Sequence, residues 1–230
     1  MIEVTYIDHM GNDLSVVNAA RVSFGKKSKL ECIDMVKGKF VLNHKDAKLI
    51  KYLAKHNHKS PFNHTFVTFH VKAPIFVARQ LVKHEYMPWN EISRRYVDSE
   101  PEFYVPDEWR GRSADKKQGS DGVVELPEYA HIRSDWKGYA GPRNYYKTAF
   151  HVYNDLLKNG VCPEQARMVL PQSMMTEWYW SGTVYAFAKM CQLRCAKDTQ
   201  QESREVAMQV SEYMEKLFPA SWDALWEHGT

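Results

Sequence analysis

Polar side chains of several different types lie close together between Arg79 and Tyr96. Pro74 is tolerated in a first helical turn and opens an expected helix over 75–84. Helical spacing puts Gln80, Lys83 and His84 on one face of that helix. An amide, an ammonium and an imidazole presented together are unlike an apolar core stripe. This helix face is therefore a candidate binding surface for an anionic small molecule.

A second group of polar side chains follows Pro88. If residues 91–95 are extended, Glu91, Ser93 and Arg95 point to one side of the chain while Arg94 points to the other. A guanidinium pairs a phosphate through two parallel hydrogen bonds, and a hydroxyl adds a short one. The set is typical of a site for a phosphorylated nucleoside. The alternative is a solvated, charge-rich connection between two elements.

Arg194 lies on the apolar face of an expected helix over 183–194. It is seven residues after Phe187, on the same stripe. An unpaired buried charge costs several kcal/mol, so this guanidinium needs a partner or a ligand. The alternative is that its stem covers the core while its head reaches water. A further arginine, Arg167, lies in a short expected helix bracketed by Pro163 and Pro171.

Other kinds of chemistry have weaker support in the sequence. His56 and His58 have a His-x-His spacing but no nearby Cys or carboxylate that would complete a metal site. Cys191 and Cys195 are one helical turn apart on an apolar stripe, which favours small buried side chains. No metal is expected. The sequence has neither a Gly-x-Gly-x-x-Gly pattern after a strand nor a phosphate-binding loop, which argues against a dinucleotide-binding dehydrogenase or an NTPase.

The elements that must position these residues mix helices and strands. Alternation predicts strands over 2–7, 64–71 and 173–180. Helices are expected over 14–22, 46–56, 75–84, 143–159, 163–170, 183–194 and 200–217. Residues 106–142 are rich in charge and glycine and predict a long, mobile loop. The fold class is α+β, and residues 1–230 are expected to form a single catalytic domain with that loop as an insertion.

Composition limits the protein class. The chain has 230 residues, of which 44% are hydrophobic and 26% charged, as in a globular protein with one core. Four cysteines are too few for a disulfide scaffold of this size, which suits a reducing cytoplasm. No secretory signal, membrane span or basic stripe for nucleic acid is visible, so neither a membrane nor nucleic acid is expected as a partner. The net charge of +3 suits an anionic ligand.

The stretch 73–96 resembles the flavin-dependent thymidylate synthases. That family carries an Arg-His-Arg triplet, then seven residues and a serine. Here Lys83-His84-Glu85, seven residues and Ser93 fill the same frame, followed by Arg95-Tyr96. Two residues depart from the family pattern: Lys83 keeps the charge but lacks the guanidinium fork, and Glu85 reverses the sign.

Further segments are similar to the same family. Gln192-Leu193-Arg194 resembles an Asn/Gln-Leu-Arg segment whose arginine activates the pyrimidine, and Arg167 precedes a Leu-Pro pair as in the family. Residues 12–24 and 56–64 are similar to segments that line the flavin. The resemblance covers about residues 10–105 and 145–205.

The resemblance implies reductive methylation of dUMP to dTMP, with FAD as cofactor, NADPH as reductant and 5,10-methylenetetrahydrofolate as carbon donor. It implies a homotetramer with sites built across subunits, and Arg194 as the catalytic residue. The residues expected to bind dUMP are Gln80, Lys83, Glu91, Ser93, Arg94, Arg95, Arg167 and Arg194. Those expected to bind FAD are Ser23, His58, Ser60, Lys83, His84, Glu85, Glu91 and Lys189.

Two alternatives remain open at the level of sequence. The same aromatic and basic residues would suit a nucleotide- or RNA-binding module without catalysis. The departures at Lys83 and Glu85 also leave room for a related dUMP hydroxymethylase. Cys162 precedes Pro163 and lacks the Pro-Cys-His context of cysteine-dependent thymidylate synthases, so no cysteine is expected to act as a nucleophile.

Overall fold

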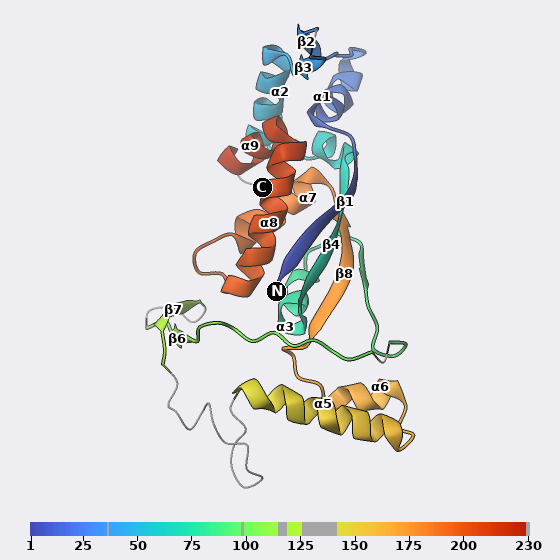
Figure 1. Cartoon of the computed structure of the whole chain (residues 1–230). Coiled ribbons are helices and arrows are strands. Elements are labelled where there is room, and N and C mark those ends of the chain that lie inside the picture. The colour runs from blue at the N-terminus through green and yellow to red at the C-terminus, as the bar shows by residue number, and fades with distance from the viewer. Residues whose placement is uncertain (36, 98, 115–118, 126–141, 229–230) are drawn as a thin grey trace.

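The computed structural model describes residues 1–35, 37–97, 99–114, 119–125 and 142–228. Its centre is an antiparallel four-stranded sheet with the strand order β1-β4-β8-β5 (Figure 1). The strands are β1 (Glu3–Met10), β4 (Phe66–Pro74), β8 (Met175–Gly182) and β5 (Trp89–Glu91). The predicted strands are confirmed with ends displaced by one to three residues, whereas the short β5 was not predicted.

The two faces of the sheet differ in polarity because side chains alternate along each strand. In β4, Val67, Phe69 and Val71 are fully buried. Between them, Thr68 hydrogen-bonds Ser181 of β8 at 2.9 Å on the other face. The alternation therefore directs one face of the sheet to the core and leaves the other polar.

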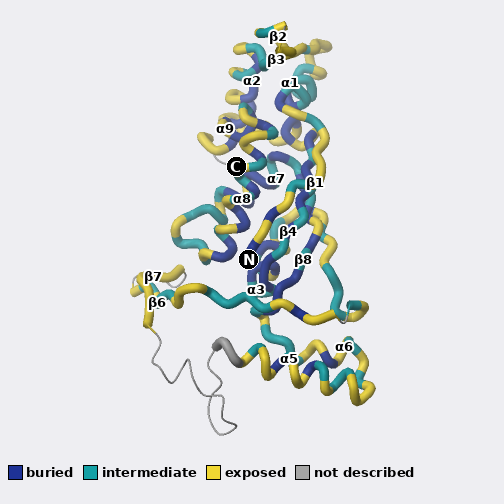
Figure 2. The backbone as a smooth tube through the Cα atoms, in the orientation of Figure 1, coloured by how far each residue is buried: buried dark blue, intermediate teal, exposed yellow. Residues whose placement is uncertain are grey.

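Helices cover the apolar face of the sheet, and the buried residues concentrate between the two layers (Figures 1 and 2). These helices are α3 (Ile75–Leu81), α7 (Val184–Arg194) and α8 (Gln201–Leu217), and α9 (Pro219–His228) packs on α2, α7 and α8. Trp180, Phe187 and Met214 are fully buried in this layer. The helix predicted over 75–84 ends earlier, at Leu81, so Lys83 and His84 lie in the turn after it.

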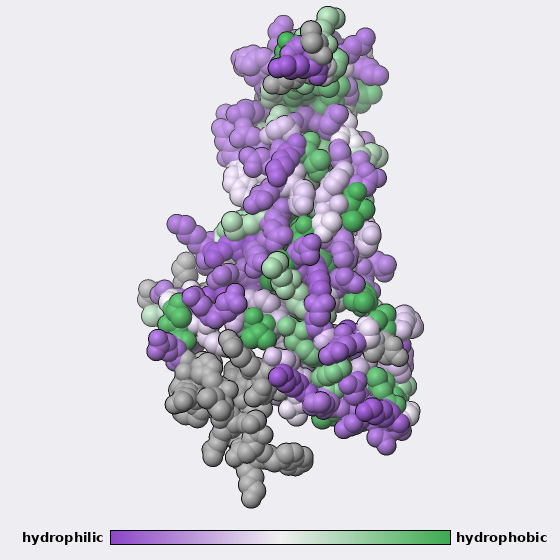
Figure 3. All heavy atoms as spheres, in the orientation of Figure 1, coloured by the Kyte–Doolittle hydropathy of each residue, from purple (hydrophilic) through white to green (hydrophobic). Residues whose placement is uncertain are grey.

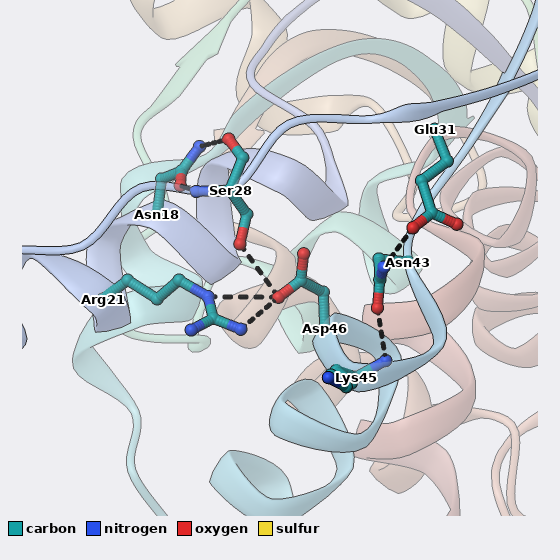
Figure 4. Close-up of polar contacts among 7 residues, drawn as sticks. All are labelled: Asn18, Arg21, Ser28, Glu31, Asn43, Lys45 and Asp46. Atoms are coloured by element: carbon teal, nitrogen blue, oxygen red, sulfur yellow. Dashed lines mark hydrogen bonds and ion pairs between the residues drawn. The ribbon is translucent and has the colours of Figure 1, made fainter.

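One end of the molecule is built from α1 (Asp13–Arg21), α2 (His44–Lys55) and a hairpin of β2 (Glu31–Asp34) and β3 (Lys39–Val41). Hydrogen bonds tie the segment after α1 to α2 (Figure 4). Ser28 donates its backbone N–H to Asn18 at 2.7 Å and its hydroxyl to Asp46 at 2.9 Å. Arg21 also donates to Asp46, through Nε at 3.0 Å. This end carries the 3₁₀ turns Val22–Phe24 and Ser60–His64.

The opposite end of the molecule consists of α5 (Pro142–Lys158), α6 (Pro163–Ala166) and the 3₁₀ turn Arg167–Val169 (Figure 1). Tyr153 and Ala166 are fully buried there, but they do not belong to the main core cluster. In place of the single helix predicted over 163–170, the chain forms the short helix α6 and then the 3₁₀ turn. Helices α5 and α6 pack against each other outside the main core cluster.

Part of the predicted loop over 106–142 has regular structure. Residues Arg110–Arg112 (β6) and Ser120–Val123 (β7) pair as an antiparallel hairpin. The prediction of an unstructured loop is wrong for these residues, while 115–118 and 126–141 lie outside the described residues. The extended conformation expected over 91–95 is also only partly correct, because a turn at 94–96 follows Ser93.

Large hydrophobic side chains are exposed at both ends of the molecule. Phe24 and Met35 at one end are 78% and 90% exposed, and Met168 at the other is 78% exposed. On the face in Figure 3 hydrophilic residues predominate, and hydrophobic ones occur in separate groups. Among the described residues, no helix combines the length and apolarity needed to cross a membrane.

Candidate active site

A cavity of about 1150 Å³ opens where α3, the end of α7 and the start of α8 meet the β6–β7 segment. Two residues predicted from sequence, Gln80 and Arg194, line it. Aromatic side chains form much of the remaining wall, from Phe76, Tyr104, Trp109, Tyr145 and Tyr146. A cavity of this size, with flat apolar walls and a few convergent polar groups, is typical of a small-molecule site.

The Arg194 guanidinium is held by two neutral acceptors. Its Nε donates to His84 Nε2 at 3.1 Å, and its Nη2 donates to the backbone carbonyl of Gln80 at 3.1 Å. Burial, with added repulsion from Arg194 and Lys189, lowers the pKa of His84 to about 4. His84 is therefore a neutral acceptor at pH 7. No carboxylate among the described residues pairs with Arg194, so its positive charge is left for a ligand.

The Gln80 side chain is fixed from α8. Ser203 Oγ, which is fully buried, donates to Gln80 Oε1 at 3.0 Å. Gln80 Nε2 donates to Gln200 Oε1. Gln80 and Gln200 both line the cavity, so the amide pair forms part of its polar wall.

A second, smaller cavity of about 140 Å³ brings together three more predicted residues, Glu91, Arg94 and Arg167. Thr176 in β8 donates its hydroxyl to Glu91 Oε1 at 2.7 Å. Arg167 is exposed and donates to the backbone carbonyl of Glu164 at 3.3 Å. These residues are thus near one another but do not line the cavity that holds Arg194.

The other site residues predicted within 83–95 lie outside both cavities. Lys83 and Glu85 are exposed in the turn after α3, and neither forms an ion pair with a described residue. Arg95 is exposed, with its guanidinium 4.9 Å from the centre of the Tyr96 ring. Ser93 Oγ accepts a hydrogen bond from the backbone N–H of Arg95 at 3.3 Å. None of these residues lines either cavity.

The residues expected at the flavin from the N-terminal part of the chain lie at the end of the molecule formed by α1 and α2 (Figure 1). Ser23 is exposed in the turn after α1, and His58 and Ser60 are exposed after α2. Lys189, by contrast, is on α7 and close enough to lower the pKa of His84. Within one chain, the predicted site residues therefore lie at the cavity that Arg194 lines, at the smaller cavity that Arg167 lines, and at the end formed by α1 and α2.

Sequence reasoning missed three residues that line the large cavity: Arg110 in β6, Tyr104 before it and Glu202 in α8. Arg110 Nη2 pairs with Glu202 at 2.6 Å, and Tyr104 donates its hydroxyl to the same carboxylate at 3.3 Å. Burial disfavours ionisation of Glu202, but the hydrogen bonds that it accepts and the positive charge of Arg110 together outweigh burial and lower the pKa of Glu202. Burial also raises the pKa of Tyr104 to about 12. A feature of the sequence that could have indicated this part of the site is the polar pair Glu202-Ser203, which lies at the start of α8 on its buried face.

The described residues hold no group of three His, Cys, Asp or Glu side chains that could bind a metal ion. Cys191 is buried and donates to the carbonyl of Ala207 at 3.4 Å, as expected for a packed thiol. Burial raises its pKa. A hydrogen bond from Cys191 instead lowers the pKa of Cys195. Cys162 is exposed in the turn before α6.

Comparison with known proteins gives the same fold and family. The structure superposes on that of a UMP/dUMP methylase PolB from Streptomyces cacaoi, solved with 5-Br dUMP, with a TM-score of 0.76 and 29% sequence identity. The match covers 100% of this chain and 96% of the methylase chain. The fold is thus that of a solved pyrimidine-nucleotide methylase.

The thymidylate synthase complementing protein family matches residues 5–220. Flavin-dependent thymidylate synthases are 38% identical in a strain of Thermus thermophilus, over 98% of this chain and 76% of the relative, and 35% identical in Thermosipho africanus, over 95% and 88%. The chain belongs to the family of flavin-dependent thymidylate synthases. The resemblance expected from the Lys83-His84-Glu85 frame is confirmed.

Proposed function

We propose that this chain methylates dUMP to dTMP as a flavin-dependent thymidylate synthase, with 5,10-methylenetetrahydrofolate as carbon donor and NADPH as reductant. The observation that carries the proposal is the Arg194 guanidinium, which lies on the cavity wall and is held by two neutral acceptors. Such a cation stabilises negative charge that develops on a bound pyrimidine. The assignment of that pyrimidine nucleotide as dUMP is inferred from the family.

The described side chains fit a flavin dinucleotide in most respects. Exposed hydroxyl, imidazole and ammonium groups of Ser60, His58, Lys83 and Lys189 can donate to phosphate and ring oxygens. Glu85 is the misfit, since a carboxylate repels phosphate. Ser23, His84 and Glu91 complete the proposed FAD contacts. When bound, FAD supplies the hydride, which the protein's own side chains cannot.

The protein's own contribution is binding and charge. Arg194, positioned by His84 and Gln80, would face the pyrimidine edge and favour the anionic ring character that makes C5 nucleophilic. The other proposed dUMP contacts supply hydrogen bonds to the nucleotide and its phosphate: Gln80, Lys83, Glu91, Ser93, Arg94, Arg95 and Arg167. No enzyme nucleophile is required, so Ser93 is assigned to binding.

We also propose a homotetramer whose active sites combine residues of different subunits. Support comes from the division of the proposed residues among the Arg194 cavity, the Arg167 cavity and the end that carries Ser60. The residues proposed for dUMP are thus divided between two separate cavities of one chain, and the FAD residue Ser60 lies outside both. The exposed apolar side chains at both ends of the molecule suit subunit contacts. The proposed enzyme acts in the cytoplasm, and its substrates are small molecules.

The test is turnover by the purified protein. With FAD, NADPH, methylenetetrahydrofolate and dUMP together, dTMP should form, and omission of any one should prevent it. Arg194→Ala should lower the rate by a factor of about 10²–10³ while most FAD binding remains, since its role is in the ring chemistry. Arg204→Ala, an arginine of α8 that donates to the carbonyl of Lys197, is the matched control. Absence of dTMP from the complete mixture, or near-normal turnover by Arg194→Ala, would overturn the assignment.

A further inference from the structure

The amide of Gln80 is held by two residues at the start of α8. Gln80 Nε2 donates to Gln200 Oε1, and Ser203 Oγ donates to Gln80 Oε1. Gln80 and Gln200 both line the cavity.

These two hydrogen bonds define the orientation of the Gln80 amide. Gln80 offers its Nε2 to Gln200 Oε1, which leaves its Oε1 as the acceptor for the Ser203 hydroxyl.

The burial of Ser203 makes this arrangement costly to change. Ser203 is fully buried in the first part of α8, and its hydroxyl reaches across to α3. Were the Gln80 amide reversed, two amide oxygens would face each other at Gln200, with a repulsive contact and an unmade hydrogen bond. The network thus selects one of the two orientations of the amide.

We propose that Ser203 and Gln200 are positioning residues that hold the Gln80 amide with its oxygen towards α8 and its N–H donors towards the cavity. Gln80 then presents a donor to the nucleotide and selects a hydrogen-bond acceptor at that position. Gln80 also anchors Arg194 through its backbone carbonyl, so both groups are set from one short stretch of α3. This inference rests on the proposed function, because the ligand is taken to be dUMP.

A double-mutant cycle tests the proposal, with dUMP affinity measured by calorimetric titration of the full-length protein. Gln80→Ala and Ser203→Ala should each weaken dUMP binding about three- to tenfold, as expected for one hydrogen bond. If Ser203 acts through Gln80, adding Ser203→Ala to Gln80→Ala should change the affinity by less than about twofold. Independent, multiplicative losses would overturn the proposal, as would wild-type dUMP affinity in Ser203→Ala.

Further variants separate positioning from folding. Ser203→Thr keeps the hydroxyl and should restore most of the dUMP affinity, whereas a packing role alone would give no rescue. Ser221→Ala removes another fully buried serine hydroxyl, in α9 and outside the cavity lining, and should leave dUMP affinity unchanged. If Ser203→Ala does not fold, the same cycle run with Gln200→Ala, a partly exposed position, decides the question.

The outcomes distinguish this inference from the proposed function. If the wild-type protein does not bind dUMP, the proposed function fails and this inference falls with it. If the wild type binds dUMP and Gln80→Ala weakens that binding, but the cycle shows no coupling, the proposed function stands and the role of Ser203 is refuted. Unchanged dUMP affinity in Gln80→Ala also refutes the inference without affecting the function of Arg194.

Discussion

His84 illustrates how one side chain acquires a role from its surroundings. The family frame assigns it to the flavin, but in the folded chain its Nε2 accepts from Arg194. This acceptor role requires a neutral imidazole, and burial keeps the imidazole neutral by lowering its pKa to about 4. His84 therefore holds the Arg194 guanidinium in position even without a bound ligand.

The lowered pKa of His84 predicts a specific dependence of stability on pH. The unfolded chain takes up a proton near the ordinary pKa of about 6.5, whereas the folded chain takes it up only near 4. The contribution of His84 to stability is therefore complete above pH 6.5 and is lost as the pH falls towards 4. Urea unfolding of the wild type and His84→Gln between pH 7 and pH 4.5 should show a shallower loss in the variant, which retains an acceptor but does not titrate.

His151→Gln, a change at an exposed histidine of α5, is the control for that series and should follow the wild-type pH profile. If His84→Gln and the wild type lose stability in parallel, burial does not hold the imidazole neutral in the folded protein.

Glu85 is the residue whose charge least fits the proposed flavin site. It is exposed, and no described residue forms an ion pair with it. A like charge near a phosphate costs about 1 kcal/mol at 4 Å in water, and salt screens it. Glu85→Arg should therefore strengthen FAD binding or leave it unchanged, with the larger effect at low ionic strength. FAD titrations at two salt concentrations measure this.

Glu215→Arg makes the same charge change on an exposed part of α8 and controls for net charge. A tenfold loss of FAD affinity in a folded Glu85→Arg protein would mean that Glu85 makes a needed contact. The alignment of Lys83-His84-Glu85 with the family's Arg-His-Arg triplet would then not predict the role of Glu85.

At the scale of elements, the sequence predicted the helices and strands that show a periodic pattern of hydrophobic residues. Alternating residues identified β4, and helical periodicity identified α7 and α8. The short strands β2, β3, β5, β6 and β7 were missed because each has only three or four residues, too few for a periodic pattern. Helix α9 was missed because its N-terminus is capped from a distant part of the chain. The Ser203–Gln80 contact was out of reach for the same reason, since it joins residues 123 positions apart.

Asp13 provides that distant cap. Its carboxylate oxygens each accept a backbone N–H at 2.9 Å, from Ala220 and from Ser221 in the first turn of α9. Asn12, rather than Asp13, caps α1. Asp13→Ala should lower the free energy of unfolding by about 1–3 kcal/mol, because two buried donors lose a charged acceptor. Denaturant unfolding measures the change.

Asp223→Ala removes an exposed carboxylate of α9 that pairs with Lys51 at 3.5 Å, and should have little effect on stability. Equal losses in the two variants would show that the Asp13 cap contributes no more than a surface ion pair.

At the scale of the whole molecule, family resemblance proposes the residues of the site, and the fold determines where they lie. Gln80, His84 and Arg194 come together in one chain, although α3 ends at Leu81 and helical spacing does not place His84. Arg167 and Glu91 meet at a different cavity, and Ser60 begins a 3₁₀ turn that packs on α1. Periodicity and spacing carry no information about such distances, which depend on how α5, α6 and the α1–α2 end extend from the sheet.

This division predicts that two inactive variants can restore activity to each other. If one active site takes Arg194 from one subunit and Arg167 from another, an Arg194→Ala chain and an Arg167→Ala chain can share a site that has both arginines. Random mixing places intact copies at both positions in about one quarter of the sites of a symmetric oligomer. Each variant alone should be nearly inactive, and an unfolded and refolded equal mixture should regain about a quarter of wild-type dTMP formation. Sedimentation of the wild type should give four times the mass of the chain. A mixture that exchanges subunits but stays inactive would place both arginines in the same subunit's site and refute an active site shared in this way.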